Sequence, residues 1–330
     1  KKMVVALGTT TRAPAGKVPS KRFPGATRRV RTRCGVAPGK QDGCTASRRD
    51  ALRLGALLAA LSQIGSQAAC GKDAATAVAQ VEAEANSVLR AATSKEVAAI
   101  ADGLSVVNKG KAPALLRLVF HDAGTYERST GRGGSNGSVR FELDRPESRG
   151  LKRGLNVVEA VKKRIRAKSK VDLSYADLIV VLGAWAVKAC GGPEIEVLLG
   201  RRDSSVADAE NMIPDENLPV VGIKDAFSRM GLDTRDLVAL SGSHALGGKG
   251  FGDPLTFDNE YYKTILKKPW LNKKDEMAQM IGIPSDRVLP DDPECRKIVK
   301  EFADDEQKFF QQFTESYSKM ATLGYKLGGA

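Results

Sequence analysis

Apolar residues recur at three- and four-residue spacing along most of the chain after residue 75, which is the period of amphipathic helices. Ser174 and Asp233 are suited to cap the helices that follow them. No pairs of alternating strands are visible in the sequence, so we predict an all-α fold. The predicted helices are Ala75–Ala101, Ala112–His121, Gly154–Ala167, Ser174–Ala189, Ile223–Arg229, Asp233–Gly242, Asp258–Leu266, Pro293–Phe302 and Asp305–Gly324.

The chain has two histidines, and each stands where an apolar helix runs into a Gly-rich turn. Taken singly, His121 or His244 is most simply a hydrogen-bonded core residue. However, Arg117 precedes His121 by four residues and therefore lies on the same helix face, one turn earlier. A base and a fixed cation aimed at one point suit heterolysis of a peroxide O–O bond, because His moves the proton and Arg stabilises the departing oxygen. His244 is then placed to bind iron on the opposite side of a flat cofactor.

With these motifs the chain resembles the haem-peroxidase superfamily, in particular its ascorbate-peroxidase-like class and the thylakoid lumenal members of plants and green algae. The resemblance extends from about Val88 to Gly324. It implies a two-lobed fold in which the cofactor cleft lies between the lobes. Further motifs in the family's order are Gly131–Ser138, Leu173–Leu178, Cys190–Pro193, Leu199–Asp203, Phe257–Tyr262 and Ile283–Asp286.

The resemblance assigns a role to each residue of the cleft. Arg117 and His121 match the catalytic pair, and Phe120 matches the aromatic wall beside them. His244 matches the proximal ligand of haem b, and Asp286 matches the carboxylate that accepts a hydrogen bond from its ring. The implied substrate is hydrogen peroxide.

A calcium site is also implied by the resemblance, at positions that match the distal calcium loop of secreted peroxidases. These are Asp122, Gly134, Asn136 and Ser138, with Asn136 in place of a family Asp. Calcium prefers several hard oxygens that include carboxylates. The lost charge argues against calcium at this position.

Two departures concern the distal side. The family Asn that hydrogen-bonds the distal imidazole falls on Lys152, and a supporting Glu falls on Pro146. Lysine is only a donor, so it cannot accept a proton from His121. If Lys152 faces the cavity, its charge lowers the pKa of His121 and slows peroxide cleavage.

Other departures concern the electron donor. Only five residues separate Gly247 from Asp253, where ascorbate peroxidases carry a longer loop with the proximal Trp and the Arg that binds ascorbate. Trp185 and Trp270 do not fall at the proximal position, and Ala245 replaces a cation-binding Thr. Ascorbate is therefore in doubt, and the donor stays open.

Residues 1–69 hold 14 Lys and Arg against two acids, a net charge of +12 out of the chain's +13. Because the basic charge lies there, no nucleic-acid partner is inferred. Residues 1–46 have the composition of a chloroplast transit peptide, and residues 47–69 resemble a twin-arginine lumen signal. That signal comprises Arg48-Arg49, an apolar run from Leu54 to Ile64 that is too short to span a membrane, and small residues. Cleavage could fall as late as Ala77, leaving a domain of residues 78–330.

Of the five cysteines, Cys190 and Cys295 are the ones that fall well inside this domain, and the spacing does not say whether they pair. Two functions remain open at this point. The first is a haem peroxidase of the thylakoid lumen that reduces hydrogen peroxide. The alternative is a non-catalytic peroxidase fold that serves as an auxiliary protein associated with photosystem II.

Overall fold

The structure, a computed structural model, describes residues 88–327, which belong to one unit of the chain. The predicted segments 1–46 and 47–69, and the predicted domain start at 78, lie outside the described residues. The α-helices are α3 (Ser94–Leu104), α4 (Ala112–Ala123), α5 (Lys152–Ser169), α6 (Tyr175–Ala189), α7 (Val220–Met230), α8 (Thr234–Ser241), α9 (Glu260–Lys267), α10 (Glu276–Gln279), α11 (Pro284–Val288), α12 (Pro293–Asp304) and α13 (Glu306–Ala321). Short 3₁₀ helices are η1 (Lys109–Lys111), η2 (Ser138–Phe141), η3 (Pro146–Ser148), η4 (Gly242–Ala245), η5 (Pro269–Leu271) and η6 (Leu289–Asp291).

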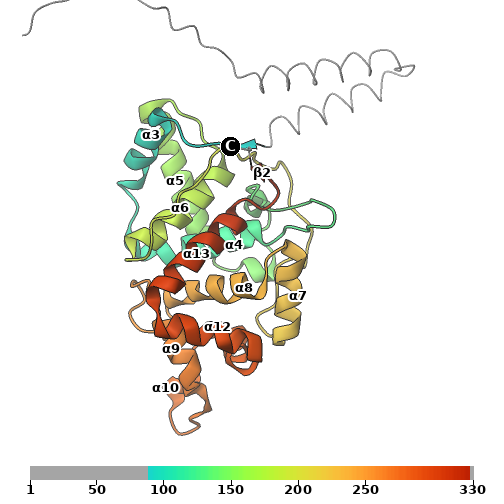
Figure 1. Cartoon of the computed structure of the whole chain (residues 1–330). Coiled ribbons are helices and arrows are strands. Elements are labelled where there is room, and N and C mark those ends of the chain that lie inside the picture. Colours follow the sequence, from blue (N-terminus) through green and yellow to red (C-terminus); the bar gives the residue numbers. More distant parts are fainter. Residues whose placement is uncertain (1–87, 328–330) are drawn as a thin grey trace, which may run out of the picture. The chain divides into compact units, whose positions relative to one another are not determined.

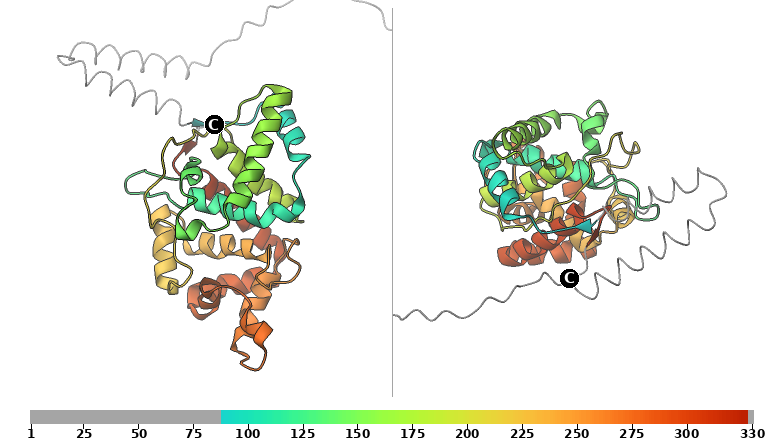
Figure 2. Two further views of the ribbon diagram at one scale, coloured as in Figure 1. Left: turned by 180° about the vertical axis from the view of Figure 1, so that it is seen from behind. Right: turned by 90° about the horizontal axis from the view of Figure 1, so that it is seen from above.

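The helices form two groups that share a middle layer. Figures 1 and 2 show α3, α5 and α6 in one group and α7, α8, α9 and α12 in the other, with α4 and α13 between them. The strands in the described residues are two residues long, β1 (Val88–Leu89) and β2 (Lys326–Leu327), and they pair in parallel. The predicted all-α class is confirmed. None of the helices in residues 88–327 is long and apolar enough to cross a bilayer.

Capping residues set several of the helix starts that the sequence predicts. The Ser174 hydroxyl accepts a hydrogen bond from the Asp177 backbone N–H at 3.0 Å, at the start of α6. Asp233 accepts from the Asp236 N–H at 2.8 Å and forms a capping box at the start of α8. These bonds satisfy donors that the first turn of a helix leaves unpaired.

One helix prediction is wrong within the described residues. The segment 88–93 was predicted as part of Ala75–Ala101, but α3 begins only at Ser94. Thr93 and Glu96 form a capping box, which fixes the helix start there. Upstream, the Arg90 backbone exchanges 2.8 Å hydrogen bonds with Leu199 and keeps the chain extended.

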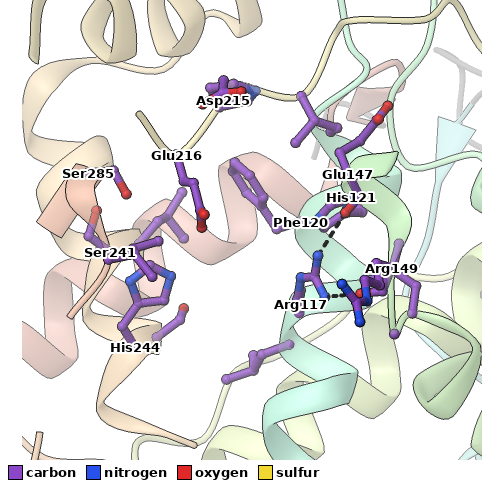
Figure 3. Close-up of a pocket in the computed structure, with 18 of the residues that line it drawn as sticks. Arg117, Phe120, His121, Glu147, Arg149, Asp215, Glu216, Ser241, His244 and Ser285 are labelled. Atoms are coloured by element: carbon purple, nitrogen blue, oxygen red, sulfur yellow. Dashed lines mark hydrogen bonds between the residues drawn. The ribbon is translucent and has the colours of Figure 1, made fainter. Parts of the chain in front are cut away.

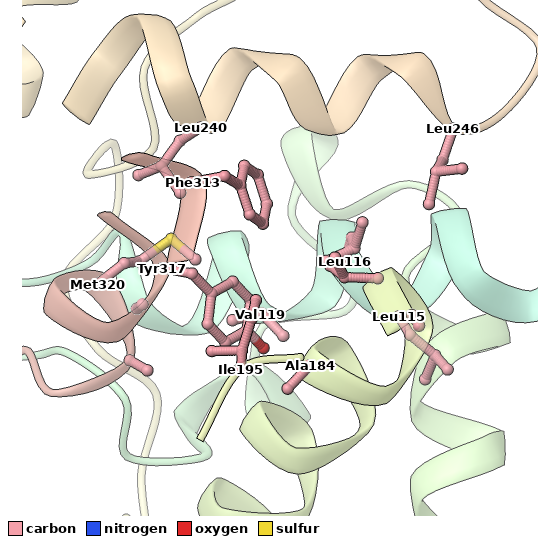
Figure 4. Packing of buried hydrophobic residues seen from close by; sticks show 14 of the residues in the cluster. Leu115, Leu116, Val119, Ala184, Ile195, Leu240, Leu246, Phe313, Tyr317 and Met320 are labelled. Atoms are coloured by element: carbon pink, nitrogen blue, oxygen red, sulfur yellow. The ribbon is translucent and has the colours of Figure 1, made fainter. Parts of the chain in front are cut away.

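The core joins both helix groups through α4, α6, α8 and α13 (Figure 4). Tyr317 of α13 is fully buried and donates a 2.7 Å hydrogen bond to the Val180 carbonyl of α6. A Cβ on Gly183 would lie 2.3 Å from the Tyr317 hydroxyl oxygen, so this crossing requires glycine. Cys190 and Cys295 are buried free thiols, which answers the pairing question.

The apolar stripe of α4 decides which way its polar residues face. Leu118, Val119 and Ala123 have no exposed surface. Burying this stripe anchors α4 in the core. As a result, Arg117 and His121 line the cavity described next.

Candidate active site

A cavity of about 1880 Å³ lies between the two helix groups. α4 supplies Arg117, Phe120 and His121 to its wall, and η4 supplies His244 on the other side (Figure 3). Phe120 is half-buried and stacks on Phe227 of α7, with ring centroids 6.0 Å apart. The structure thus brings together residues that are more than 120 positions apart in the sequence.

Arg117 is held by two backbone carbonyls. Its Nη1 donates to the Arg149 oxygen at 2.6 Å and its Nη2 to the Glu147 oxygen at 2.7 Å (Figure 3). Burial lowers the pKa of Arg117 from its ordinary value and the Glu216 charge raises it, with a net decrease. Arginine stays charged at neutral pH. The η3 turn therefore fixes a cation at the cavity wall.

His121 is a buried neutral base. Its side chain is 7% exposed, and burial together with the Arg117 charge lowers its pKa to about 3. Its Nδ1 is fully buried and has no hydrogen-bond partner among the described residues. A molecule in the cavity can therefore exchange a proton with His121 only through Nε2.

His244 is tied to a buried carboxylate. Its Nδ1 lies 2.7 Å from Asp286 Oδ1, while its ring is 35% exposed at the cavity wall. Burial opposes protonation of His244, but the Asp286 charge and hydrogen bond outweigh it and raise the pKa. With Nδ1 engaged, Nε2 is the nitrogen left to meet a ligand.

The carboxylate of Asp286 is itself fixed from two further directions. Oδ1 accepts a 2.9 Å hydrogen bond from the Tyr261 hydroxyl, and Oδ2 accepts one of 2.9 Å from the Ile283 backbone N–H. Burial alone would raise the pKa of Asp286, but the His244 charge and these hydrogen bonds lower it. The carboxylate thus stays ionised and holds the His244 ring in one orientation.

Comparison with known proteins identifies this arrangement. The peroxidase family model matches residues 88–252, half of the chain. The chain belongs to the peroxidase family. It lies in the ascorbate-peroxidase-like branch of that family, and its helical architecture is consistent with the haem-peroxidase fold.

Three relatives illustrate the similarity of this chain to known proteins. "Putative L-ascorbate peroxidase 6" of Arabidopsis thaliana is 51% identical over 67% of this chain and 66% of its own length. "Probable L-ascorbate peroxidase 4, peroxisomal" of Oryza sativa is 40% identical over 67% and 76%. "Putative heme-binding peroxidase" of Pyricularia oryzae is 34% identical over 71% and 87%. Membership among the thylakoid lumenal proteins stays a prediction.

Lys152 does not face the cavity. It is the first residue of α5, is exposed, and does not line the cavity, although Pro146 does. The low pKa of His121 comes from burial and Arg117. The condition under which Lys152 would lower this pKa, a side chain that faces the cavity, is therefore not met. Nδ1 of His121 still lacks an acceptor among the described residues.

The shortened segment after His244 forms a Gly-rich wall. Gly247, Gly248 and Lys249 line the cavity, and Gly247 has a φ of 102°, which favours glycine. Phe251 is buried and packs edge-on against Tyr261 at 4.8 Å. Neither Trp185 nor Trp270 lines the cavity.

The four residues predicted for calcium lie in a hydrogen-bonded network of another kind. Asp122 accepts from the backbone N–H groups of Gly137 and Val139, at 2.9 and 3.3 Å. Asn136 Nδ2 and Ser138 Oγ donate to Asp208, at 3.1 and 3.0 Å, and the Gly134 N–H donates to Thr125. Burial raises the pKa of Asp122 to about 7. The side chains of Asp122, Asn136 and Ser138 thus bond to backbone N–H groups and to Asp208, and calcium binding stays an untested prediction.

Sequence reasoning missed Tyr261 and Glu216. Tyr261 belongs to the quoted Phe257–Tyr262 motif, and an aromatic hydroxyl in that motif was the available signal. Glu216 lies in an irregular segment, and Figure 3 shows its side chain between His244 and Arg117. No periodicity marks such a position, so only the structure reveals a carboxylate there.

Proposed function

We propose that this protein is a haem-dependent peroxidase that reduces hydrogen peroxide. The observation that carries the proposal is the pairing of two histidine sites across one cavity. Arg117 and His121 form one wall, and His244 hydrogen-bonded to Asp286 forms the other. Family membership and the printed name of the Pyricularia relative, a heme-binding peroxidase, support the same conclusion.

The residues present fit haem b. His244 offers Nε2 to the cavity while Asp286 holds Nδ1, the arrangement that suits an iron-binding imidazole. A cavity of about 1880 Å³ with Phe120 and Leu246 in its wall can enclose a large flat apolar ring. We infer that His244 is the iron ligand and that Asp286 and Tyr261 strengthen its electron donation.

When bound, haem supplies the iron that accepts a peroxide and the two electrons that cleave its O–O bond. His121 would take a proton from one oxygen of the peroxide and return it to the departing oxygen. Arg117, fixed by the Arg149 and Glu147 carbonyls, would stabilise the negative charge that develops there. A pKa near 3 keeps His121 neutral at neutral pH, and it also makes His121 a weaker proton acceptor than an ordinary histidine.

The unpaired Nδ1 sets a limit on this base. A neutral imidazole that accepts through Nε2 carries its proton on Nδ1, where no acceptor is present among the described residues. An unsatisfied buried donor costs about 1–3 kcal/mol. The other tautomer leaves Nδ1 as an unsatisfied acceptor, so neither form is paired, and no acceptor stabilises the imidazolium that forms when Nε2 takes a proton. We therefore propose that peroxide cleavage is slower than with a paired histidine.

Ascorbate is a doubtful electron donor for this chain. The segment between Gly247 and Gly252 has no room for the longer loop of ascorbate peroxidases, and it holds Lys249 as its one cation. We leave the donor unspecified and propose a small molecule or a donor at the protein surface.

A non-catalytic role is the second candidate, and the unpaired Nδ1 of His121 is the observation that favours it. Such a protein would retain the fold as an auxiliary near photosystem II. Loss of the distal acceptor would then be an early step in the loss of activity.

The visible spectrum of haem-loaded protein tests the proposal. We expect a Soret band that His244→Ala abolishes, since His121 is the only other histidine in the chain. His121→Ala is the matched control and should keep the band while slowing the reaction with peroxide by about 10²–10⁴-fold. A Soret band that survives His244→Ala would contradict the assignment, and an unchanged peroxide rate in His121→Ala would favour the non-catalytic candidate.

We also propose delivery to the thylakoid lumen, with residues 1–46 as a transit peptide and 47–69 as a twin-arginine signal. The acid-poor basic composition supports the first part. Arg48-Arg49 followed by a short apolar run supports the second.

A further inference from the structure

A projection extends from the His244 side of the molecule. It comprises residues 267–282, which lead from the end of α9 through η5 and α10 to the start of α11. Figure 1 shows α10 in this projection, next to α9, and both figures show the projection extending beyond α9 and α12. The projection therefore presents a surface that the core does not use.

The tip of the projection exposes large apolar side chains. Leu271, Met277 and Met280 are 67%, 73% and 72% exposed, more than any other large apolar residue among those described. The remaining exposed ones are scattered over other elements. Scattered apolar residues are normal on a surface, whereas a cluster on one protruding element indicates an interaction site.

The projection is held in shape by contacts within it and with Arg287 of α11. Arg287 Nη2 donates to the Gln279 carbonyl at 2.6 Å, and its guanidinium lies 5.8 Å from the centre of the Trp270 ring. Asp275 caps α10 by accepting from the Met277 N–H at 3.1 Å. These contacts keep the apolar side chains outward, so little conformational entropy would be lost on docking.

Charges of both signs lie near these apolar side chains, with lysines in excess. Lys267, Lys273 and Lys274 are exposed. Lys268 is paired with Asp291. The acids of the tip are the consecutive residues 275 and 276 at the start of α10, so residues 267–280 hold four lysines and two acids. The tip thus offers a net positive charge together with apolar side chains.

We propose that the projection docks on an anionic lipid surface. Leu271, Met277 and Met280 would enter the interfacial layer, and Lys273 and Lys274 would meet the headgroups. A stable protein–protein interface typically needs about 20–30 residues on each side, and the tip of this projection is much smaller. A lipid surface requires only a few inserted side chains with adjacent lysines, so it is the occupant that fits.

The measured signal must come from the projection itself, because residues 1–69, with a net charge of +12, would also attract anionic vesicles. Trp270 lies within the projection, and Trp185 is the only other tryptophan. In a Trp185→Phe background of the full chain, Trp270 fluorescence is followed on titration with vesicles of equal parts phosphatidylglycerol and phosphatidylcholine. We expect a blue shift that is absent with pure phosphatidylcholine vesicles.

Two variants and their matched controls test the contacts. Leu271→Ser with Met277→Ser and Met280→Ser should abolish the shift, and Lys273→Glu with Lys274→Glu should weaken the apparent affinity at least tenfold. Val97→Ser with Val221→Ser, and Lys95→Glu with Lys163→Glu, change other exposed residues elsewhere and should leave the shift intact. Circular dichroism checks that each variant is folded.

Three outcomes would overturn the proposal. One is vesicle binding without a Trp270 shift, which would assign the binding to another part of the chain. A second is equal loss of the shift in the control variants. The third is self-association in sedimentation equilibrium that the triple serine variant removes while vesicles have no effect, which would make the occupant a second copy of the chain.

Discussion

At the scale of single residues, the two histidines are perturbed in opposite directions. Burial and the Arg117 charge lower the pKa of His121 to about 3, whereas Asp286 raises the pKa of His244 despite burial. The difference follows from one partner, because His244 has a carboxylate at 2.7 Å and His121 has none. The two residues should therefore affect stability over different ranges of pH.

The first prediction concerns the haem-free protein. The unfolded state binds a proton at His121 below about pH 6.5, but the folded state does so only near pH 3, so His121 removes stability as the pH falls through this range. His121→Gln should therefore reduce the loss of folding stability between about pH 6.5 and pH 3. The folded pKa of His244 is raised, so its contribution is full below about pH 6.5 and is lost as the pH rises through the folded value.

Urea unfolding midpoints across this pH range provide the measurement for both histidines. His244→Gln is the matched control and should lose stability mainly on the acid side, opposite to His121→Gln. If the urea midpoints of the two variants changed with pH in the same way, the pKa values of the two histidines would not be shifted in opposite directions.

Glu216 gives a second prediction at this scale. Its charge raises the pKa of Arg117, and Figure 3 shows its side chain on the path between the two histidine walls. Glu216→Gln should therefore strengthen binding of fluoride to the haem-loaded protein by several-fold, because one opposing charge is removed. Glu210→Gln also changes a cavity-lining carboxylate and is the control. Equal effects of the two variants in a spectral titration would assign the change to net charge alone.

The sequence predicted the site residues better than their surroundings. The motifs name His121, His244 and Asp286. In the structure the two histidines line the cavity, and Asp286 is hydrogen-bonded to His244. Tyr261 and Glu216 were missed because their roles depend on how distant segments meet. The orientation of Lys152 stayed open in the sequence because a match in sequence does not say which way the first residue of a helix points.

At the scale of elements, periodicity predicted the long helices and failed for the short pieces. α6 and α8 begin one residue after their predicted caps, Ser174 and Asp233. α10 and the 3₁₀ helices have too few residues to show a period. The stretch 88–93 was read as helix because its composition continues that of α3, while long-range pairing of Arg90 with Leu199 decides its conformation.

The crossing of α6 with α13 gives the prediction for this scale. A Cβ on Gly183 would lie 2.3 Å from the Tyr317 hydroxyl and 2.4 Å from a methyl carbon of Val119. Gly183→Ala should therefore destabilise the protein by about 1–3 kcal/mol, as overpacking does in other cores. A Cβ on Gly248 meets nothing within 4 Å, so Gly248→Ala should stay within about 0.5 kcal/mol of the parent. Equal urea midpoints for the two variants would mean that the helices adjust freely.

At the scale of the whole chain, the charge is divided unevenly. Residues 1–69 carry +12 and the rest carries +1, so the basic character of the chain does not belong to the domain that holds the cavity. In the proposed function, the two parts act one after the other. The basic segment would direct transport, and the peroxidase domain would act afterwards.

The last prediction separates the two steps of transport. Twin arginine is read by a receptor, so charge alone should not replace it. In isolated chloroplasts, Arg48→Lys with Arg49→Lys should leave import into the stroma intact and stop delivery to the lumen, so that an intermediate of reduced size accumulates. Arg28→Lys with Arg29→Lys keeps the same charge at an adjacent arginine pair outside 47–69 and is the matched control. Because the control retains the proposed lumen signal, it should reach the lumen normally. Lumenal processing of the Arg48/Arg49 variant at the parent's rate would show that residues 47–69 are not a twin-arginine signal.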